Sequence, residues 1–217
     1  MAQNRHIALW GYEDWLYDDG SILIKHICAN KHLSIQVHPN DDVAQITGGK
    51  AKTEMWHILK SGPIFAGFKH DVTKQDIEKA IKHGSLEQLL VKIDTRVGEC
   101  YLIPGGLVHA IGEGTQVLEV QQSSNTTFRL YDWNRVDANG ISRQLHIKEA
   151  LMALNICLPP PSPCDAIICK YFEFKATHID NAILTDRYQI IYDNVNMLIK
   201  IVTPSKNVFA IPFNPSI

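Results

Sequence analysis

The chain has 217 residues, of which 45% are hydrophobic and 20% are charged. These proportions are those of an average globular protein and exclude a disordered, collagen-like or coiled-coil chain. Lys and Arg number 21 against 23 Asp and Glu, without a basic block, so we expect no nucleic-acid partner. No apolar run reaches the roughly 18 residues of a membrane span, and the N-terminus lacks a signal-peptide pattern, so we expect a cytoplasmic protein without a membrane partner.

Short strands separated by turn residues dominate the chain from residue 20 onward. Period-two alternation and the Gly, Asn and Pro turn signals predict eight strands before residue 135. They lie at 21–29, 33–39, 53–60, 62–69, 99–106, 107–114, 116–122 and 126–133. Residues 72–93 have helical spacing instead, with a break at Gly84 before a second short helix, and another helix is predicted over 141–155.

The proline-rich stretch at 159–163 predicts a linker, and four further candidate strands lie between residues 170 and 212. Many short strands with only two helical zones favour a β-sandwich or barrel over an alternating parallel sheet. The predicted fold is therefore mainly β. A barrel with helical insertions over 1–157 would carry the chemistry, and 158–217 would form the linker and a shortened second β-domain packed on the first.

A row of polar residues marks the predicted strand LSIQVHP. Ser34, Gln36 and His38 alternate there with three aliphatic residues. Because successive side chains on a strand point to opposite faces, the three polar residues share one face and the aliphatic residues share the other. Such a row predicts a barrel interior that holds a ligand.

Two further motifs place charged residues and a histidine on predicted strands. In KTEMW, Lys52 and Glu54 share a face with Trp56, a spacing that also suits a solvent-exposed outer strand. In GECYLIPGGLVH, a strand leads from Gly98 into a Pro-Gly-Gly turn, and His109 follows as the next strand begins. We expect the His109 side chain to point into the barrel. The spacing of Gly, Pro, Gly and His in this third motif matches the second signature of the cupin barrels.

Two histidines, a glutamate and an amide on facing strands suit a divalent transition metal. These candidate ligands are Gln36, His38, Glu54 and His109. Imidazole nitrogen and carboxylate oxygen bind zinc, and other divalent metals accept the same ligands. We expect one Zn²⁺ per chain, with another divalent metal as the alternative.

These motifs, together with EVQQSSNTTFRLYDWNR and R-QLHI, make residues 20–150 resemble the type I phosphomannose isomerases, specifically the short bacterial mannose-6-phosphate isomerases of the cupin superfamily. The resemblance implies a cupin (jelly-roll) barrel in which the same four residues hold zinc. It also implies that Arg129 is the catalytic arginine and that Ser34 and Lys52 flank the sugar or its phosphate. Glu119 matches a further pocket carboxylate of the family, with a shift of one residue.

The activity that the resemblance implies is the zinc-dependent interconversion of mannose 6-phosphate and fructose 6-phosphate. A base would move a proton between the first two carbons through an enediol, while zinc and Arg129 stabilise the developing negative charge. The proton-transfer group stays open between Lys52, Glu119 and a metal-bound water. Lys52 could act as a base only if its pKa were depressed. The sequence also leaves a homo-oligomer open.

Two other functions fit the same motifs. A metal cupin of other chemistry, such as an oxygenase, usually presents two histidines in the first motif, and Gln36 replaces the first of them here. A non-catalytic sugar-phosphate-binding paralogue is suggested by N- and C-terminal regions that are short compared with the family. The second β-segment carries no metal-ligand motif, so we expect it to be structural.

Overall fold

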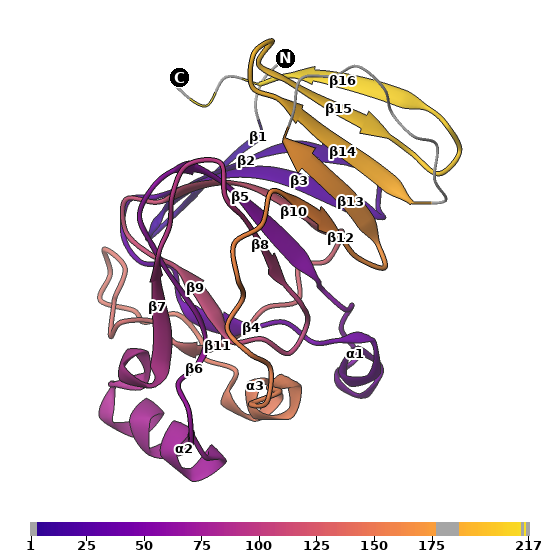
Figure 1. Ribbon diagram of the computed structural model, residues 1–217. Coiled ribbons are helices and arrows are strands. Elements are labelled where there is room, and N and C mark those ends of the chain that lie inside the picture. The colour runs from indigo at the N-terminus through magenta and orange to yellow at the C-terminus, as the bar shows by residue number, and fades with distance from the viewer. Residues whose placement is uncertain (1–3, 177–186, 214, 216–217) are drawn as a thin grey trace.

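Two β-sheets face each other in the computed structural model, which describes residues 4–176, 187–213 and 215 (Figure 1). The first sheet has six strands in the order β1-β2-β3-β10-β5-β8, and the second has five in the order β11-β4-β9-β6-β7. A third sheet, in the order β12-β13-β14-β15-β16, packs on the outer face of the first (Figure 1). The prediction of a mainly β, cupin-like fold is confirmed.

The first sheet consists of β1 (Asn4–Ala8), β2 (Gly11–Asp18), β3 (Ile22–Ala29), β10 (Gln116–Gln122), β5 (Glu54–Lys60) and β8 (Cys100–Ile103). The second consists of β11 (Phe128–Tyr131), β4 (Ile35–Val37), β9 (His109–Ile111), β6 (Pro63–Phe68) and β7 (Leu90–Asp94). The third consists of β12 (Ala166–Ile168), β13 (Phe172–Ala176), β14 (Tyr188–Asp193), β15 (Leu198–Val202) and β16 (Val208–Pro212). The helices are α1 (Asp41–Thr47), α2 (Lys74–His83), α3 (Ile147–Ala153) and the 3₁₀ turn η1 (Leu86–Leu89).

The first sheet is buried on both faces. Its inner face packs on the second sheet through a cluster that includes Trp56 and Ile64, and its outer face packs on the third sheet through a cluster that includes Met55 and Phe174. Burial on both faces explains why the sequence of β3 is mostly apolar, since all eight of its residues are buried. Helices α2 and α3 cover the outer face of the second sheet, as Figure 1 shows below the barrel.

Two predicted helices differ from the structure. The second short helix predicted after Gly84 is the single 3₁₀ turn η1. It ends at Leu89 because the chain then becomes β7, whose pairing with β6 outweighs the local helical spacing. The helix predicted over 141–155 is α3, which begins only at Ile147. Residues before it instead run beside β11, where His146 N donates to Arg129 O at 2.8 Å.

The sequence patterns do not predict α1, β1, β2 or β12. Helix α1 buries a single residue, Ala44, so it has no apolar period, and its ends are set locally by the Asn40 cap and by Gly48 at φ 73°. The exposed strand β1 likewise lacks a buried face that alternation could reveal. These short elements are stabilised by their neighbours rather than by a pattern of their own.

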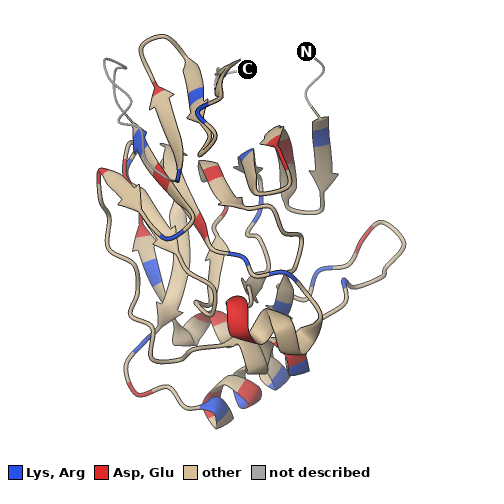
Figure 2. Ribbon diagram, turned by 90° about the vertical axis from the view of Figure 1, so that its right-hand side faces the viewer, with Lys and Arg blue, Asp and Glu red and all other residues tan. Residues whose placement is uncertain are grey.

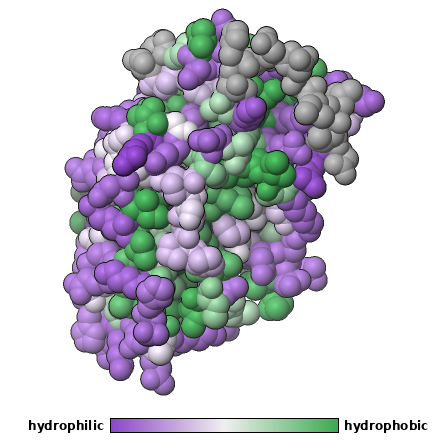
Figure 3. Space-filling model, in the orientation of Figure 1, coloured by the Kyte–Doolittle hydropathy of each residue, from purple (hydrophilic) through white to green (hydrophobic). Residues whose placement is uncertain are grey.

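Charged residues of both signs alternate along the chain (Figure 2), and the face seen in Figure 1 carries both polar and apolar side chains (Figure 3). Figure 2 shows Lys and Arg interspersed with Asp and Glu, most densely along α2. Figure 3 shows apolar side chains scattered among polar ones on the face seen in Figure 1. Among the helices of the described residues, none is long and apolar enough to cross a membrane.

His57 on β5 makes the contact between the first and third sheets sensitive to acid. Its ring lies 5.4 Å from Phe174 and 5.5 Å from Tyr192, between centroids, and burial there lowers its pKa to about 4. An unfolded histidine has a pKa of about 6.5, so between these values the unfolded chain binds the additional proton. Stability is therefore fully present above pH 6.5 and falls as the pH drops toward 4, by up to about 3 kcal/mol.

We expect the His57→Phe variant to lose most of this acid dependence, because it keeps an aromatic ring but cannot take up a proton. Urea unfolding at pH 7.0 and 4.5 measures the difference for each protein. The exposed His83→Ala variant should keep the wild-type dependence. Equal pH dependence in His57→Phe and wild type would contradict the prediction.

Candidate metal centre and substrate cavity

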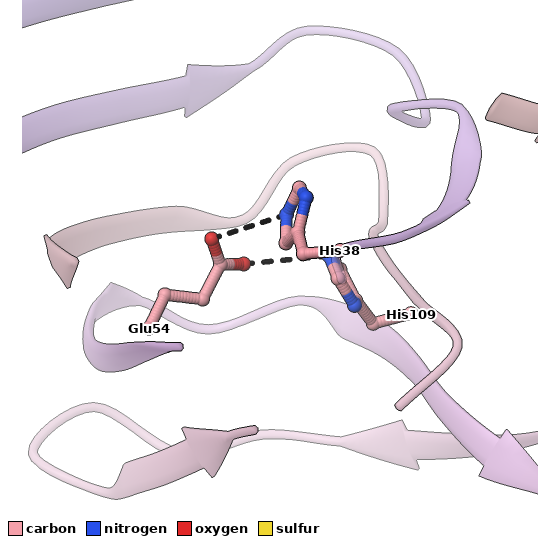
Figure 4. Close-up of side chains that lie close together, drawn as sticks. All are labelled: His38, Glu54 and His109. Atoms are coloured by element: carbon pink, nitrogen blue, oxygen red, sulfur yellow. Dashed lines mark ion pairs between the residues drawn. The ribbon is translucent and has the colours of Figure 1, made fainter. Parts of the chain in front are cut away.

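Three side chains with metal-ligating atoms converge in the barrel interior (Figure 4). His38 follows β4 and His109 begins β9, both in the second sheet, whereas Glu54 begins β5 in the first. His38 Nε2 lies 3.3 Å from Glu54 Oε2, and His109 Nε2 lies 3.4 Å from Glu54 Oε1. A tetrahedral metal with bonds of about 2.0–2.1 Å holds its ligand atoms about 3.3 Å apart, so these separations fit a bound ion.

Main-chain carbonyls orient both imidazole rings. His38 Nδ1 lies 2.9 Å from Thr126 O, and His109 Nδ1 lies 2.8 Å from Leu107 O. Because a carbonyl only accepts, each Nδ1 carries the proton and donates it, which leaves each Nε2 with a lone pair facing Glu54. Histidines that bind metals have this arrangement, in which the second ring nitrogen is tied to an outer acceptor.

Burial keeps both rings neutral. It lowers the pKa of His109, and together with the nearby Lys52 ammonium it lowers the pKa of His38 to about 3. Both side chains are 1% exposed. Neutral imidazole is the form that binds a metal, so the pair needs no proton loss at neutral pH.

Gln36, the fourth predicted ligand, lies beside His109 in cross-strand register. Its Nε2 lies 3.4 Å from His109 Nε2, and its Oε1 accepts a hydrogen bond from Ser34 Oγ at 3.0 Å. A half-turn of the amide would present Oε1 to a metal and leave Nε2 to donate to the Ser34 hydroxyl, which can also accept. Gln36 therefore fits the ligand set in that orientation.

The Pro-Gly-Gly turn sets His109 beside His38. Gly106 N donates to His38 O at 2.8 Å, and Gly106 has φ 95°, in the region that favours glycine. A Cβ at Gly105 would lie 2.8 Å from Pro39 O, so a larger residue would push the two segments apart. As a result, the centroids of the two histidine rings are only 4.8 Å apart.

Lys52 also points into this centre, as the alternation in KTEMW predicts. Its Nζ lies 2.7 Å from Glu54 Oε2 and 3.1 Å from His38 Nε2, and the residue is 5% exposed. Burial alone would lower the pKa of Lys52, but the carboxylates of Glu54 and Glu119 outweigh it and raise the pKa. Burial would likewise raise the pKa of Glu54, but Lys52 and the histidines hold it well below its usual range. Lys52 is thus a cation here, which suits an electrostatic role better than that of a base.

A cavity of about 300 Å³ opens beside the metal-ligating residues. The residues predicted to contact or convert the substrate all line it: Ser34, Lys52, Glu119 and Arg129. Arg129 is in register with Gln36, and its Nε is buried with no hydrogen-bond partner among the described residues. Glu119, matched to the family with a one-residue shift, faces this cavity and accepts a hydrogen bond from Trp56 Nε1 at 3.0 Å.

Two residues to which the sequence motifs assign no role also line the cavity, Lys25 and Arg143. Lys25 on β3 is 6% exposed, and its Nζ lies 3.3 Å from Glu13 Oε2 and 3.6 Å from Glu119 Oε1. A single lysine within the apolar run ILIKHICA is a signal that could have identified it, because a buried ammonium needs partners. Arg143 also lines the cavity, from the loop before α3, where no periodicity indicates the direction of a side chain.

Similar proteins are found by sequence and by structure, although no family model matches the chain. The chain is 38% identical to a mannose-6-phosphate isomerase of Bacillus subtilis over 158 residues, or 68% of this chain and 50% of that protein. It is also 38% identical to a mannose-6-phosphate isomerase of Streptococcus mutans over 142 residues, 64% of this chain and 45% of that protein. The crystal structure of the mannose 6-phosphate isomerase from B. subtilis superposes with a TM-score of 0.58 at 28% identity, covering 83% of this chain and 51% of that one.

The chain spans about half the length of the curated relatives it matches. The sequence match to the B. subtilis protein covers 68% of this chain, and the structural superposition covers 83% of it. On both kinds of likeness, the chain belongs to the type I phosphomannose isomerase family.

Proposed function

We propose that this protein is a zinc-dependent aldose–ketose isomerase that interconverts mannose 6-phosphate and fructose 6-phosphate. The observation that carries the proposal is the group of His38, Glu54 and His109. This group lies beside a cavity that Gln36, Lys52 and Arg129 line. The names of the related proteins supply the substrate pair. Because the chain spans about half of those proteins, activity has to be measured on this chain itself.

Gln36, His38, Glu54 and His109 would hold the metal, and the mixed nitrogen and oxygen donors suit zinc as well as other divalent ions. When bound, the ion would supply Lewis-acid polarisation of a sugar oxygen. The protein's own contribution is a buried and oriented set of ligands, so little has to rearrange when the substrate binds.

Arg129 and Lys52 would stabilise negative charge on the substrate oxygens. A guanidinium stays protonated throughout the physiological range. The Nε of Arg129 has no partner in the part of the chain that the structure describes, so it has a hydrogen bond left to donate. Lys52, held by Glu54, provides a second fixed cation. Ser34 would orient the sugar from the same wall.

Glu119 would move the proton between the first two carbons. Burial, and then the charge of Glu54, raises the pKa of Glu119 above its usual range, whereas Lys25 and Lys52 oppose this shift. A proton-transfer group works best when its pKa lies close to the working pH. Its Oε1 is buried, with Lys25 Nζ 3.6 Å away, and accepts no hydrogen bond among the described residues, so this oxygen can take a proton from the substrate.

We expect the purified, zinc-loaded chain to form fructose 6-phosphate from mannose 6-phosphate in a coupled assay, and to lose this activity on removal of the metal by a chelator. Binding of mannose 6-phosphate in calorimetry without turnover would favour the sugar-phosphate-binding alternative. Bound iron with oxygen uptake would favour another metal chemistry. Either result would overturn the proposed isomerase.

A further inference from the structure

We infer that Ser124 and Gln121 are positioning residues for the metal ligand His38, through a loop that supplies none of the four candidate metal ligands. The loop covers residues 121–126, from the end of β10 toward β11, and we call it the bracing loop. The inference rests on the metal centre of the proposed function. It concerns how tightly that centre binds an ion, not which reaction follows.

The bracing loop reaches His38 through its main chain. Thr126 O accepts the hydrogen bond from His38 Nδ1 at 2.9 Å, so the position of this carbonyl sets both the tautomer and the direction of the ring. A main-chain carbonyl cannot be removed by substitution, and its position depends on the groups that hold residues 124–126. Those groups are buried side chains of the same loop.

Ser124 fixes the carbonyl from one side. Its Oγ accepts from Thr126 N at 3.2 Å and donates to Lys50 O at 2.9 Å. The residue is 6% exposed, so water does not readily replace these bonds. Lys50 in turn donates through its N to Thr126 Oγ1 at 3.0 Å, which closes the loop against the segment that leads to the metal ligand Glu54.

Gln121 holds Ser124. Its Nε2 donates to Ser124 O at 2.9 Å and to Gln122 O at 2.8 Å, and the side chain is fully buried. In the first sheet, Gln121 is the cross-strand partner of Glu54. Gln121 therefore contacts the loop that orients His38 through its side chain and is paired with the strand that carries Glu54 through its main chain. In this way one residue links ligands from the two facing sheets.

Ser123 provides a matched comparison on the same loop. Its Oγ donates outward to Asp18 Oδ1 at 2.8 Å, in an exposed position. The side-chain hydrogen bonds that hold Thr126 therefore come from Ser124 and not from its neighbour. Loss of an outer partner of a metal-bound histidine lowers metal affinity by about 10–100-fold.

The test is a Zn²⁺ titration of the full chain against a chromogenic chelator. We expect Ser124→Ala and Gln121→Met to weaken Zn²⁺ binding by about tenfold or more. Ser123→Ala should stay within about twofold of wild type, and Ser124→Thr, which restores a hydroxyl, should recover most of the affinity. Thermal unfolding of each metal-free variant identifies proteins that have lost their fold.

A second readout does not depend on the metal. In the metal-free protein, the imidazole N–H proton of His38, assigned by its loss in His38→Gln, should give a protected NMR signal that exchanges faster in Ser124→Ala. Wild-type affinity and wild-type exchange in folded Ser124→Ala and Gln121→Met would overturn the inference while leaving the proposed function intact. Failure of the wild-type chain to bind Zn²⁺ would overturn the metal centre itself, and this inference with it.

Discussion

The His109→Ala variant should lose both tight metal binding and isomerase activity, with a fall in kcat/KM of about 10³-fold or more. His109 is one of two imidazoles that face Glu54, and its Nε2 lies 3.4 Å from the carboxylate. Lewis-acid polarisation of a substrate oxygen contributes several kcal/mol to a barrier, and each 1.36 kcal/mol is a factor of ten in rate. Loss of the ion would remove this whole contribution.

Metal content by mass spectrometry, Zn²⁺ affinity and the coupled assay measure the outcome on one preparation. His57→Phe is the matched control, because it also replaces a buried histidine of the barrel but lies on the outer face of the first sheet. We expect it to keep both the metal and the activity at neutral pH. A His109→Ala protein that retains stoichiometric zinc and more than a tenth of the wild-type rate would rule out this metal centre.

Strand alternation in the sequence predicts which polar residues of the site share a face, and the third motif favours the inward direction of that face. Ser34, Gln36 and Lys52 line the cavity, and His38 and Glu54 belong to the metal-ligating group beside it. Ile35 and Val37 pack against helices on the outer face. The reason is the period of two, which fixes the face of every residue once one of them is known. The Pro-Gly-Gly turn could be recognised for a similar reason, since its backbone angles restrict its composition.

The rest of the site depends on contacts that no local pattern encodes. Lys25 reaches the cavity because β3 lies between β2 and β10, and Arg143 because the loop before α3 runs along β11. The carbonyl that orients His38 comes from Thr126, far away in the sequence. Such contacts follow from the order of strands in the sheets, which alternation alone does not determine.

Glu119→Gln should lower kcat by about 10²–10⁴-fold, the usual contribution of a general acid–base group, and leave Zn²⁺ affinity unchanged. Glutamine keeps the size of the side chain and an oxygen that can accept from Trp56 Nε1, but it cannot exchange a proton. KM should change little, because the variant loses the group that transfers the proton and not a charged contact that binds the phosphate.

Glu13→Gln is the control for this variant, since Glu13 is the other carboxylate that faces Lys25 in the cavity. We expect Glu13→Gln to remain within about tenfold of the wild-type kcat, because it removes a neighbour of Lys25 and no proton-transfer group. The two variants lose the same charge beside the same ammonium, so a difference between them isolates the proton-transfer function of Glu119. If both variants lose activity equally, the effect comes from the loss of a negative charge beside Lys25 and not from proton transfer. If Glu119→Gln retains the wild-type kcat, the proton must be moved by another group, and Lys52 is then the side chain to test.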